Sequence, residues 1–315
     1  MYINQKTGYN FYSINTITQP IMKKKLFDSH LVPILITISI CWLFSGCTNI
    51  NYDFPVGYDL KKPQVQQLGK VMNEISGLAY DPVGPSLIAI SDSKDKIIQI
   101  GLKTKKLKDL KEHIVGPDSD IEDIVASDTA YYLLSSWGEI VEVPLKATDS
   151  TTNQTFDLNL PGQNDFETLY FDPTANGLIL ICKTCAHEKG KNIRTAFRFD
   201  LQTRAFDSVA FFTFSKDEVQ RILKDDDIQF DPSAAAIHPI NKRLYILSAA
   251  SHLLVIADTR GKIMEAYKLN PDLFPQAEGI AFAPNGDMYI SNEGKFGSPT
   301  LLYFPYKTPG NKTSK

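Results

Sequence analysis

The 315-residue chain has little clustered positive charge. Its 33 Lys and Arg residues are balanced by 36 Asp and Glu residues, which leaves a formal net charge of -3. Nucleic-acid binding needs a concentrated basic surface that neutralises phosphates. The most Lys-rich stretch, residues 103–113, is interpreted instead as the solvated face of an outer strand and its turn. We therefore expect no nucleic-acid partner.

Catalytic motifs are also missing from the sequence. It contains no Ser-His-Asp order, no nucleophile elbow and no Gly-rich phosphate loop, and its five His residues are scattered. Metal-assisted hydrolysis does not require histidine if a calcium ion polarises the substrate. The sequence therefore assigns no catalytic residue, and enzymatic activity stays an alternative.

Cysteine is scarce, with four residues in all. Cys41 and Cys47 lie near the N-terminus, while Cys182 and Cys185 form the motif CKTC. In an exported protein this motif is either a short-loop disulfide or two unpaired thiols. A zinc site would need a fourth ligand beyond these two cysteines and His187, and no second cysteine pair is present.

The N-terminal region has the features of an export signal. Lys23, Lys24 and Lys25 precede an apolar segment from residue 31 to 44, and small residues lead to Cys47. The run LFSGC resembles a bacterial lipobox, which implies cleavage before Cys47 and lipid on that cysteine. We expect an exported lipoprotein held at the outer membrane, facing the periplasm or the cell surface. An uncleaved signal anchor is the alternative.

This interpretation divides the chain into four parts. Met22 is an alternative to Met1 as the true start, because residues 1–21 have no place in a signal peptide. The parts are an extension with the signal peptide (1–47), a linker (48–61), a β-domain (62–306) and a tail (307–315).

A nine-residue segment recurs five times, as EISGLAYDP, DIEDIVASD, DFETLYFDP, DPSAAAIHP and QAEGIAFAP. Their first residues are Glu74, Asp120, Asp165, Asp231 and Gln276, so the steps are 46, 45, 66 and 45 residues. Their third residues are Ser76, Glu122, Glu167, Ser233 and Glu278. Carboxylates at these two positions are therefore part of a repeat.

Each segment is followed by further apolar runs, such as SLIAISDS and KIIQIGL after the first. The runs are rich in β-branched and aromatic residues and are separated by turn sequences such as DPVGP and APNGD. Long amphipathic helical patterns are missing. The chain therefore reads as an all-β repeat with three or four short strands per unit.

Units of this length and strand number are typical of a β-propeller. The fifth unit stops after its third strand, near Tyr306, and residues 62–71 can supply the missing strand and close the ring. The long third step contains SKDEVQRILKDD, where Ser215 and Glu218 form a capping-box pattern, so we expect an inserted helix there. The prediction is a five-bladed propeller, with a six-bladed ring as the alternative.

The repeat predicts a channel mouth lined by carboxylates. In a propeller the innermost strand of each blade lines the channel, and side chains two apart on a strand point the same way. The predicted ring consists of Glu74, Asp120, Glu122, Asp165, Glu167, Asp231 and Glu278, completed by Ser76, Ser233 and Gln276. The loops after the second strands are expected to add Asp92, Lys183, Asn292 and Glu293.

Seven carboxylates around one channel raise one another's pKa values, so they need protons, hydrogen bonds or a bound cation. Oxygen ligands without histidine suit calcium, which takes about 6–8 oxygens. We therefore expect Ca²⁺ at these carboxylates. The alternative is an ion-free mouth whose carboxylates accept hydrogen bonds from neighbouring strands. Lys183 is interpreted as a solvated loop lysine.

From about Leu68 to Tyr306 the chain resembles the SdiA-regulated family of exported bacterial proteins. The segments NEISGLAYDP, DFETLYFDP, FDPSAAAIHP and QAEGIAFAPNGDMYISNE carry the resemblance. It implies a propeller with a calcium-related role and transfers no catalytic residue. We expect a monomeric, lipid-anchored, non-catalytic module that binds calcium and a small ligand or an envelope protein. A calcium-dependent hydrolase of lactones or phosphate esters and a metal-free structural module are the alternatives.

Overall fold

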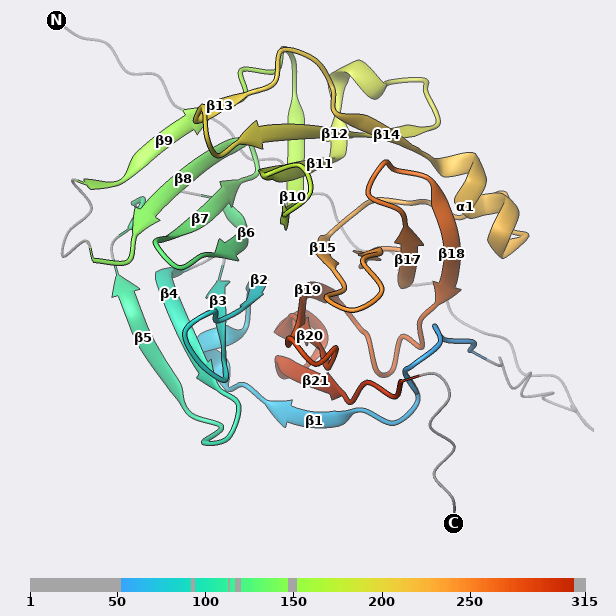
Figure 1. The fold of residues 1–315 in the computed structure, drawn as a ribbon. Helices are drawn as coiled ribbons and strands as arrows, with labels where there is room; N and C mark the ends of the chain where they lie inside the picture. Colours follow the sequence, from blue (N-terminus) through green and yellow to red (C-terminus); the bar gives the residue numbers. More distant parts are fainter. Residues whose placement is uncertain (1–51, 92–93, 113, 117–119, 147–151, 309–315) are drawn as a thin grey trace, which may run out of the picture. The chain divides into compact units, whose positions relative to one another are not determined.

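Five antiparallel sheets surround a central channel in the computed structural model of this chain (Figure 1). The structure describes residues 52–91, 94–112, 114–116, 120–146 and 152–308. Each sheet is one blade, and consecutive strands pair from the channel outward. The prediction of a five-bladed propeller is confirmed.

In blades 1 to 4 the strands follow the order of the sequence from the channel to the rim. Blade 1 consists of β2 (Ile75–Tyr80), β3 (Ser86–Ser91), β4 (Lys94–Gly101) and β5 (Leu107–Glu112). Blade 2 consists of β6 (Ile121–Ala126), β7 (Ala130–Ser135), β8 (Glu139–Pro144) and β9 (Gln154–Asp157). Blade 3 consists of β10 (Asn164–Asp172), β11 (Gly177–Cys185), β12 (Ile193–Asp200), β13 (Ala205–Phe206) and β14 (Phe212–Ser215). Blade 4 consists of β15 (Ala234–Ile237), β16 (Leu244–Ser248), β17 (Leu253–Ala257) and β18 (Ile263–Lys268).

Blade 5 joins the two ends of the described chain. It consists of β19 (Ala277–Phe282), β20 (Met288–Asn292), β21 (Thr300–Phe304) and, as its outer strand, β1 (Gln64–Gln67). β1 pairs antiparallel with β21, so an N-terminal strand closes the ring as predicted. Closure of this kind leaves only short, protected sheet edges.

The segment before β1 also packs into the propeller. Tyr58 and Leu60 are buried in the core between blades 4 and 5, and the Tyr58 hydroxyl donates to the Gly286 carbonyl at 2.5 Å. The described part of the expected linker therefore belongs to the folded core.

The core is divided among the five interfaces between neighbouring blades. Each of the five buried apolar clusters combines residues of two adjacent sheets. The middle strands have neighbours on both faces, so β3, β7, β16, β17 and β20 are buried at every position. This explains why these strands are continuous apolar runs without alternation.

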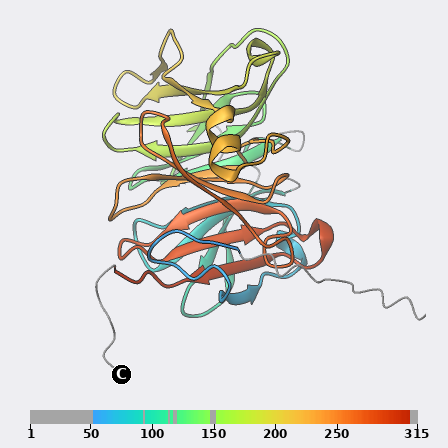
Figure 2. The ribbon, with the colours of Figure 1, turned by 90° about the vertical axis from the view of Figure 1, so that its right-hand side faces the viewer.

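The long third step of the repeat holds β13, β14 and the helix α1 (Lys216–Leu223). The Ser215 hydroxyl caps this helix by accepting a hydrogen bond from the Glu218 amide at 3.3 Å. α1 packs beside β18 on the outside of the ring (Figure 2). Within the described ranges, no helix has the length and apolar character needed to cross a membrane.

The chain divides into two units, residues 1–49 and residues 50–315. The propeller belongs to the second unit. The expected signal peptide and Cys47 belong to the first unit and lie outside the described residues.

Candidate functional site

The third position of the repeated segment lies at a β-bulge in several blades. In β6, Glu122 is an extra residue between Ile121 and Asp123, which pair with consecutive residues of β7. The same irregularity occurs at Glu167 in β10 and at Glu278 in β19. A bulge bends the strand and re-aims the side chain of the extra residue. These carboxylates are therefore oriented by local bulges.

Lys183 lies among the carboxylates at this end of the channel. Its Nζ forms an ion pair with Oε1 of Glu167 and lies 3.8 Å from Oδ2 of Asp165. Burial lowers the pKa of the Lys183 ammonium, but Glu167, Asp165 and Glu278 outweigh this effect and leave the pKa raised. Lys183 therefore acts as an internal counter-ion, which corrects its interpretation as a solvated loop lysine.

The cluster around Lys183 includes groups from four blades. Burial raises the pKa of Asp165, Lys183 opposes this effect, and the charges of Asp120 and Asp231 add to the rise. The charge of Glu293 likewise raises the pKa of Glu278. We call the following set the charged mouth: Asp120, Asp165, Glu167, Lys183, Asp231, Glu278 and Glu293.

The other residues expected at the mouth have different places. Glu74 and Glu122 lie half-buried at the same end of blades 1 and 2. Asn292, the last residue of β20, is 1% exposed, and its Nδ2 donates to the Leu273 carbonyl at 3.0 Å. It therefore stabilises blade 5 from within. Asp92 lies outside the described residues.

Burial and mutual repulsion make Glu278 an unusually weak acid. Burial raises its pKa to about 8, and the charges of Glu167 and Glu293 contribute to the rise, while Gln276 and Lys183 oppose it. Burial also raises the pKa of Glu167, against the effect of Lys183. Glu278 is therefore mainly protonated at neutral pH, and the mouth holds more acidic groups than Lys183 alone can balance.

Arg194 is a second internal cation, on β12. Its Nη1 donates to Oε2 of Glu188 at 3.0 Å, its Nε donates to the Phe230 carbonyl at 3.0 Å, and its Nη2 pairs with Asp231. Arg194 is only 8% exposed, so it is a buried partner for Asp231. The sequence analysis missed this residue, because a single arginine at the start of an apolar strand has no counterpart in the repeat.

Serine and one buried aspartate provide some of the hydrogen bonds between neighbouring blades. The Ser76 hydroxyl donates to a blade 2 carbonyl and the Ser233 hydroxyl to a blade 5 carbonyl, each at 3.0 Å. Asp123, in the fourth position of the repeat, accepts from the amides of Ile124 and Leu169 at 2.8 Å. These groups supply bonding between blades in addition to the pairing of Arg194 with Asp231, in which a carboxylate of the mouth accepts from a neighbouring blade as the ion-free alternative expects.

A disulfide joins Cys182 to Cys185 beside the mouth. Both cysteines are buried, and the two residues between them include Lys183, so the bond restrains the strand that carries this counter-ion. His187 lies next to the disulfide, and its Nε2 shares a hydrogen bond with Oγ1 of Thr195 at 2.8 Å. Thiolates are the form of cysteine that binds metals, so the bonded pair is not a zinc site.

The mouth has calcium-type ligands, but they are dispersed. Among the described residues, the Cys182, Cys185 and His187 group alone brings three potential ligand atoms of His, Cys, Asp or Glu within 4.8 Å of one another. The carboxylates of the mouth supply the hard oxygens that calcium prefers. A cation there would have to compete with the Lys183 ammonium and with the proton of Glu278.

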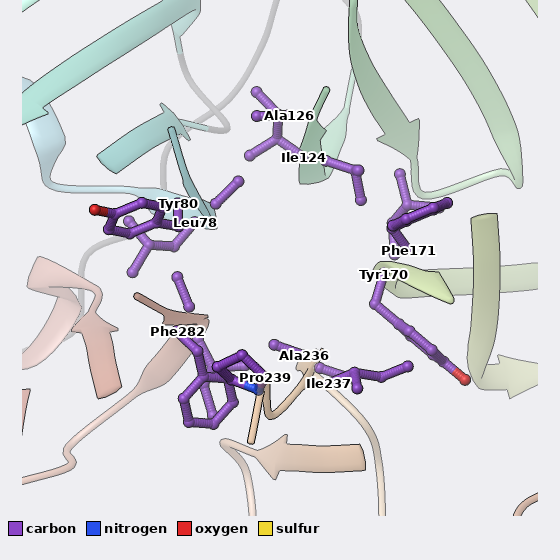
Figure 3. A pocket seen from close by; sticks show the side chains of 16 residues that line it. Leu78, Tyr80, Ile124, Ala126, Tyr170, Phe171, Ala236, Ile237, Pro239 and Phe282 are labelled. Carbon is purple, nitrogen blue, oxygen red and sulfur yellow. The ribbon is translucent and has the colours of Figure 1, made fainter. Parts of the chain in front are cut away.

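The side chains that line the other half of the channel are apolar (Figure 3). A cavity of about 190 Å³ is lined by the fifth, sixth and seventh residues of all five repeated segments, together with Pro239. No charged side chain is among the lining residues. The signal was present in the sequence as three apolar columns, which the sequence analysis treated only as strand cores.

Comparison with known proteins identifies one matching family. A family model described as SdiA-regulated matches residues 57–304. A comparison with curated proteins finds no match.

Several solved structures are similar to this chain. A glucose dehydrogenase has a TM-score of 0.50 at 12% identity, covering 76% of this chain and 99% of that chain. A luciferin-regenerating enzyme has a TM-score of 0.48 at 15% identity, covering 79% and 96% of the two chains. A nidogen/laminin complex has a TM-score of 0.45 at 14% identity, covering 70% and 73%. At 12% identity, the likeness to the glucose dehydrogenase shows the fold alone.

Proposed function

Since this chain belongs to the SdiA-regulated family and folds as a five-bladed propeller, we propose that it is a non-catalytic binding module of the cell envelope. Its charged mouth binds a divalent cation and presents that face to a small ligand or an envelope protein. The observation that carries this proposal is the excess of acid in the mouth, where burial and neighbouring charges raise the pKa of Glu278 to about 8. A divalent cation relieves this repulsion more effectively than one ammonium.

Calcium is the proposed ion. The carboxylates of the charged mouth offer the hard oxygen ligands that calcium prefers, and the charged mouth contains no histidine or cysteine. The proposed ligands are the groups nearest to Lys183, namely Asp165, Glu167 and Glu278, and they would have to draw together to hold the ion. Asp231 is already paired with Arg194, so it contributes less charge to the site. Lys183 competes with the ion for Glu167.

Calorimetry and thermal unfolding with added calcium test this proposal. Glu167→Gln is expected to weaken calcium binding about tenfold or more, since an interaction with a charged group contributes about 1.5–3 kcal/mol. Lys183→Met is expected to strengthen binding, because it removes the competing ammonium. Asp128→Asn, an exposed acid on blade 2, is the matched control and should leave the affinity unchanged.

The absence of both heat and thermal stabilisation in the unmodified protein would contradict the proposal and favour a metal-free structural module. Hydrolysis of lactones or phosphate esters that is abolished by a chelator would instead favour the calcium-dependent hydrolase. If Glu167→Gln and Lys183→Met both bind calcium as strongly as the unmodified protein, the binding site does not lie at the charged mouth.

We also propose that lipid on Cys47 tethers the propeller to the outer membrane. The support for this is the sequence: a basic segment, an apolar segment and the run LFSGC precede Cys47 in the order of a lipoprotein signal. Ten residues separate Cys47 from Tyr58, which is buried in the core between blades 4 and 5. A tether of that length would hold the propeller close to the membrane surface.

A further inference from the structure

The apolar half of the channel is built by the same repeat as the charged mouth, but no charged side chain lines it. The seventh positions of the five segments are Tyr80, Ala126, Phe171, Ile237 and Phe282, and all five line the cavity (Figure 3). Three of them are aromatic, while alanine in blade 2 leaves space beside them. Each blade contributes to the wall, so the cavity depends on closure of the ring.

Polar side-chain atoms are turned out of this cavity. The hydroxyl groups of Tyr80 and Tyr170 point away from its centre (Figure 3). The remaining lining side chains are aliphatic or aromatic hydrocarbons. A charged ligand would therefore lose its hydration without gaining a side-chain partner, which is strongly unfavourable.

Backbone amides and carbonyls make the exposed surface of this cavity more polar than its side chains suggest. Each innermost strand pairs on one side only, for example β2 with β3, so its other edge faces the channel. Unpaired backbone amides and carbonyls on that edge can bond one weakly polar substituent of a ligand. They do not compensate the burial of a full charge.

We propose that this cavity is a second binding site, which takes a small uncharged aromatic molecule of the size of a substituted benzene. Its volume of about 190 Å³ is sufficient for a benzene ring, since enclosed apolar cavities of about 150 Å³ accept benzene, although this cavity is open to solvent. Tyr80, Phe171 and Phe282 offer ring surfaces for edge-to-face or offset contacts with an aromatic ligand. The site is independent of cation binding, because it uses none of the residues of the charged mouth.

Saturation-transfer NMR with methyl benzoate and benzoate tests the chemistry of this site. The two probes share a ring, but benzoate carries a negative charge. Methyl benzoate is expected to receive saturation from the protein and to bind at least about tenfold more tightly than benzoate. No transfer to methyl benzoate, or equal binding of the two probes, would overturn the proposal.

Filling the cavity tests its location. Ala126→Phe adds a ring at the edge of the cavity and is expected to weaken methyl benzoate binding about tenfold or more. Ala205→Phe adds the same ring to an exposed position of β13 and serves as the matched control, with unchanged binding. Should thermal unfolding show that Ala126→Phe is misfolded, Ala236→Phe fills the cavity from blade 4. Unchanged affinity in a folded filling variant would place the ligand elsewhere and refute the assignment.

Discussion

Replacing Glu278 with glutamine is expected to remove a pH dependence from the free energy of unfolding. Glutamine keeps the size and polarity of the side chain but cannot ionise. The folded protein raises the pKa of Glu278 from 4.5 to about 8, chiefly through burial and then through Glu167 and Glu293. Between these two pH values the folded state retains a proton that the unfolded state has released. The contribution of this group to stability is therefore present below pH 4.5 and is lost as the pH rises toward 8.

The size of this effect follows from proton linkage. One retained proton changes the free energy of unfolding by about 1.4 kcal/mol per pH unit, so the full window corresponds to an upper limit of about 5 kcal/mol. Glu278 lies at a mouth where its side chain keeps some contact with water, and water screens its interactions. We therefore expect the free energy of unfolding of the unmodified protein to fall by about 2–3 kcal/mol between pH 5 and pH 8, relative to that of Glu278→Gln.

Urea unfolding followed by circular dichroism at pH 5, 6, 7 and 8 measures this difference. Other groups titrate alike in both proteins, so their contributions to the pH dependence of the free energy of unfolding cancel when the two proteins are compared. Asp128→Asn controls for the loss of an exposed acid and should follow the unmodified protein at every pH. A difference between Glu278→Gln and the unmodified protein that stays constant with pH would refute the assignment of a raised pKa to Glu278.

Two further changes test the disulfide and the tether. Replacing Cys182 and Cys185 with serine opens a short loop, so we expect a loss of about 2 kcal/mol of stability, measured by thermal unfolding; an unchanged Tm would show that the bond adds nothing. Cys47→Ala removes the proposed lipid site, and cell fractionation should then find the protein in the soluble fraction. Retention in the membrane fraction would argue against lipid at Cys47 as the tether.

The blade architecture was predictable because strand and turn segments recur periodically along the sequence. Each unit needs an innermost strand, two buried strands and turns, and these requirements recur at nearly constant steps. The incomplete fifth unit and the strand near residues 62–71 together predicted the pairing of β1 with β21. The step between Asp165 and Asp231 is longer than the others. The capping pattern at Ser215 indicated that an inserted helix accounts for the extra length.

The chemistry of the channel was predictable only in outline. The columns indicated an acidic mouth, but the pairing of Lys183 with Glu167 depends on bulges in β10 and β11, which no local pattern announces. Arg194 reaches Asp231 from another blade, across 37 residues of sequence. Such contacts depend on how side chains meet after the blades have packed, so spacing along one strand does not reveal them.

By itself, the sequence determined that this chain repeats a unit of three or four short strands five times and places carboxylates at equivalent positions. Periodic burial and turn formation are local, so they leave a readable pattern. Only the tertiary structure decided which acids meet, which internal cations balance them and where the apolar half of the channel begins. Those features arise from distances between separate blades, and a closed ring sets these distances only when all five blades are in place.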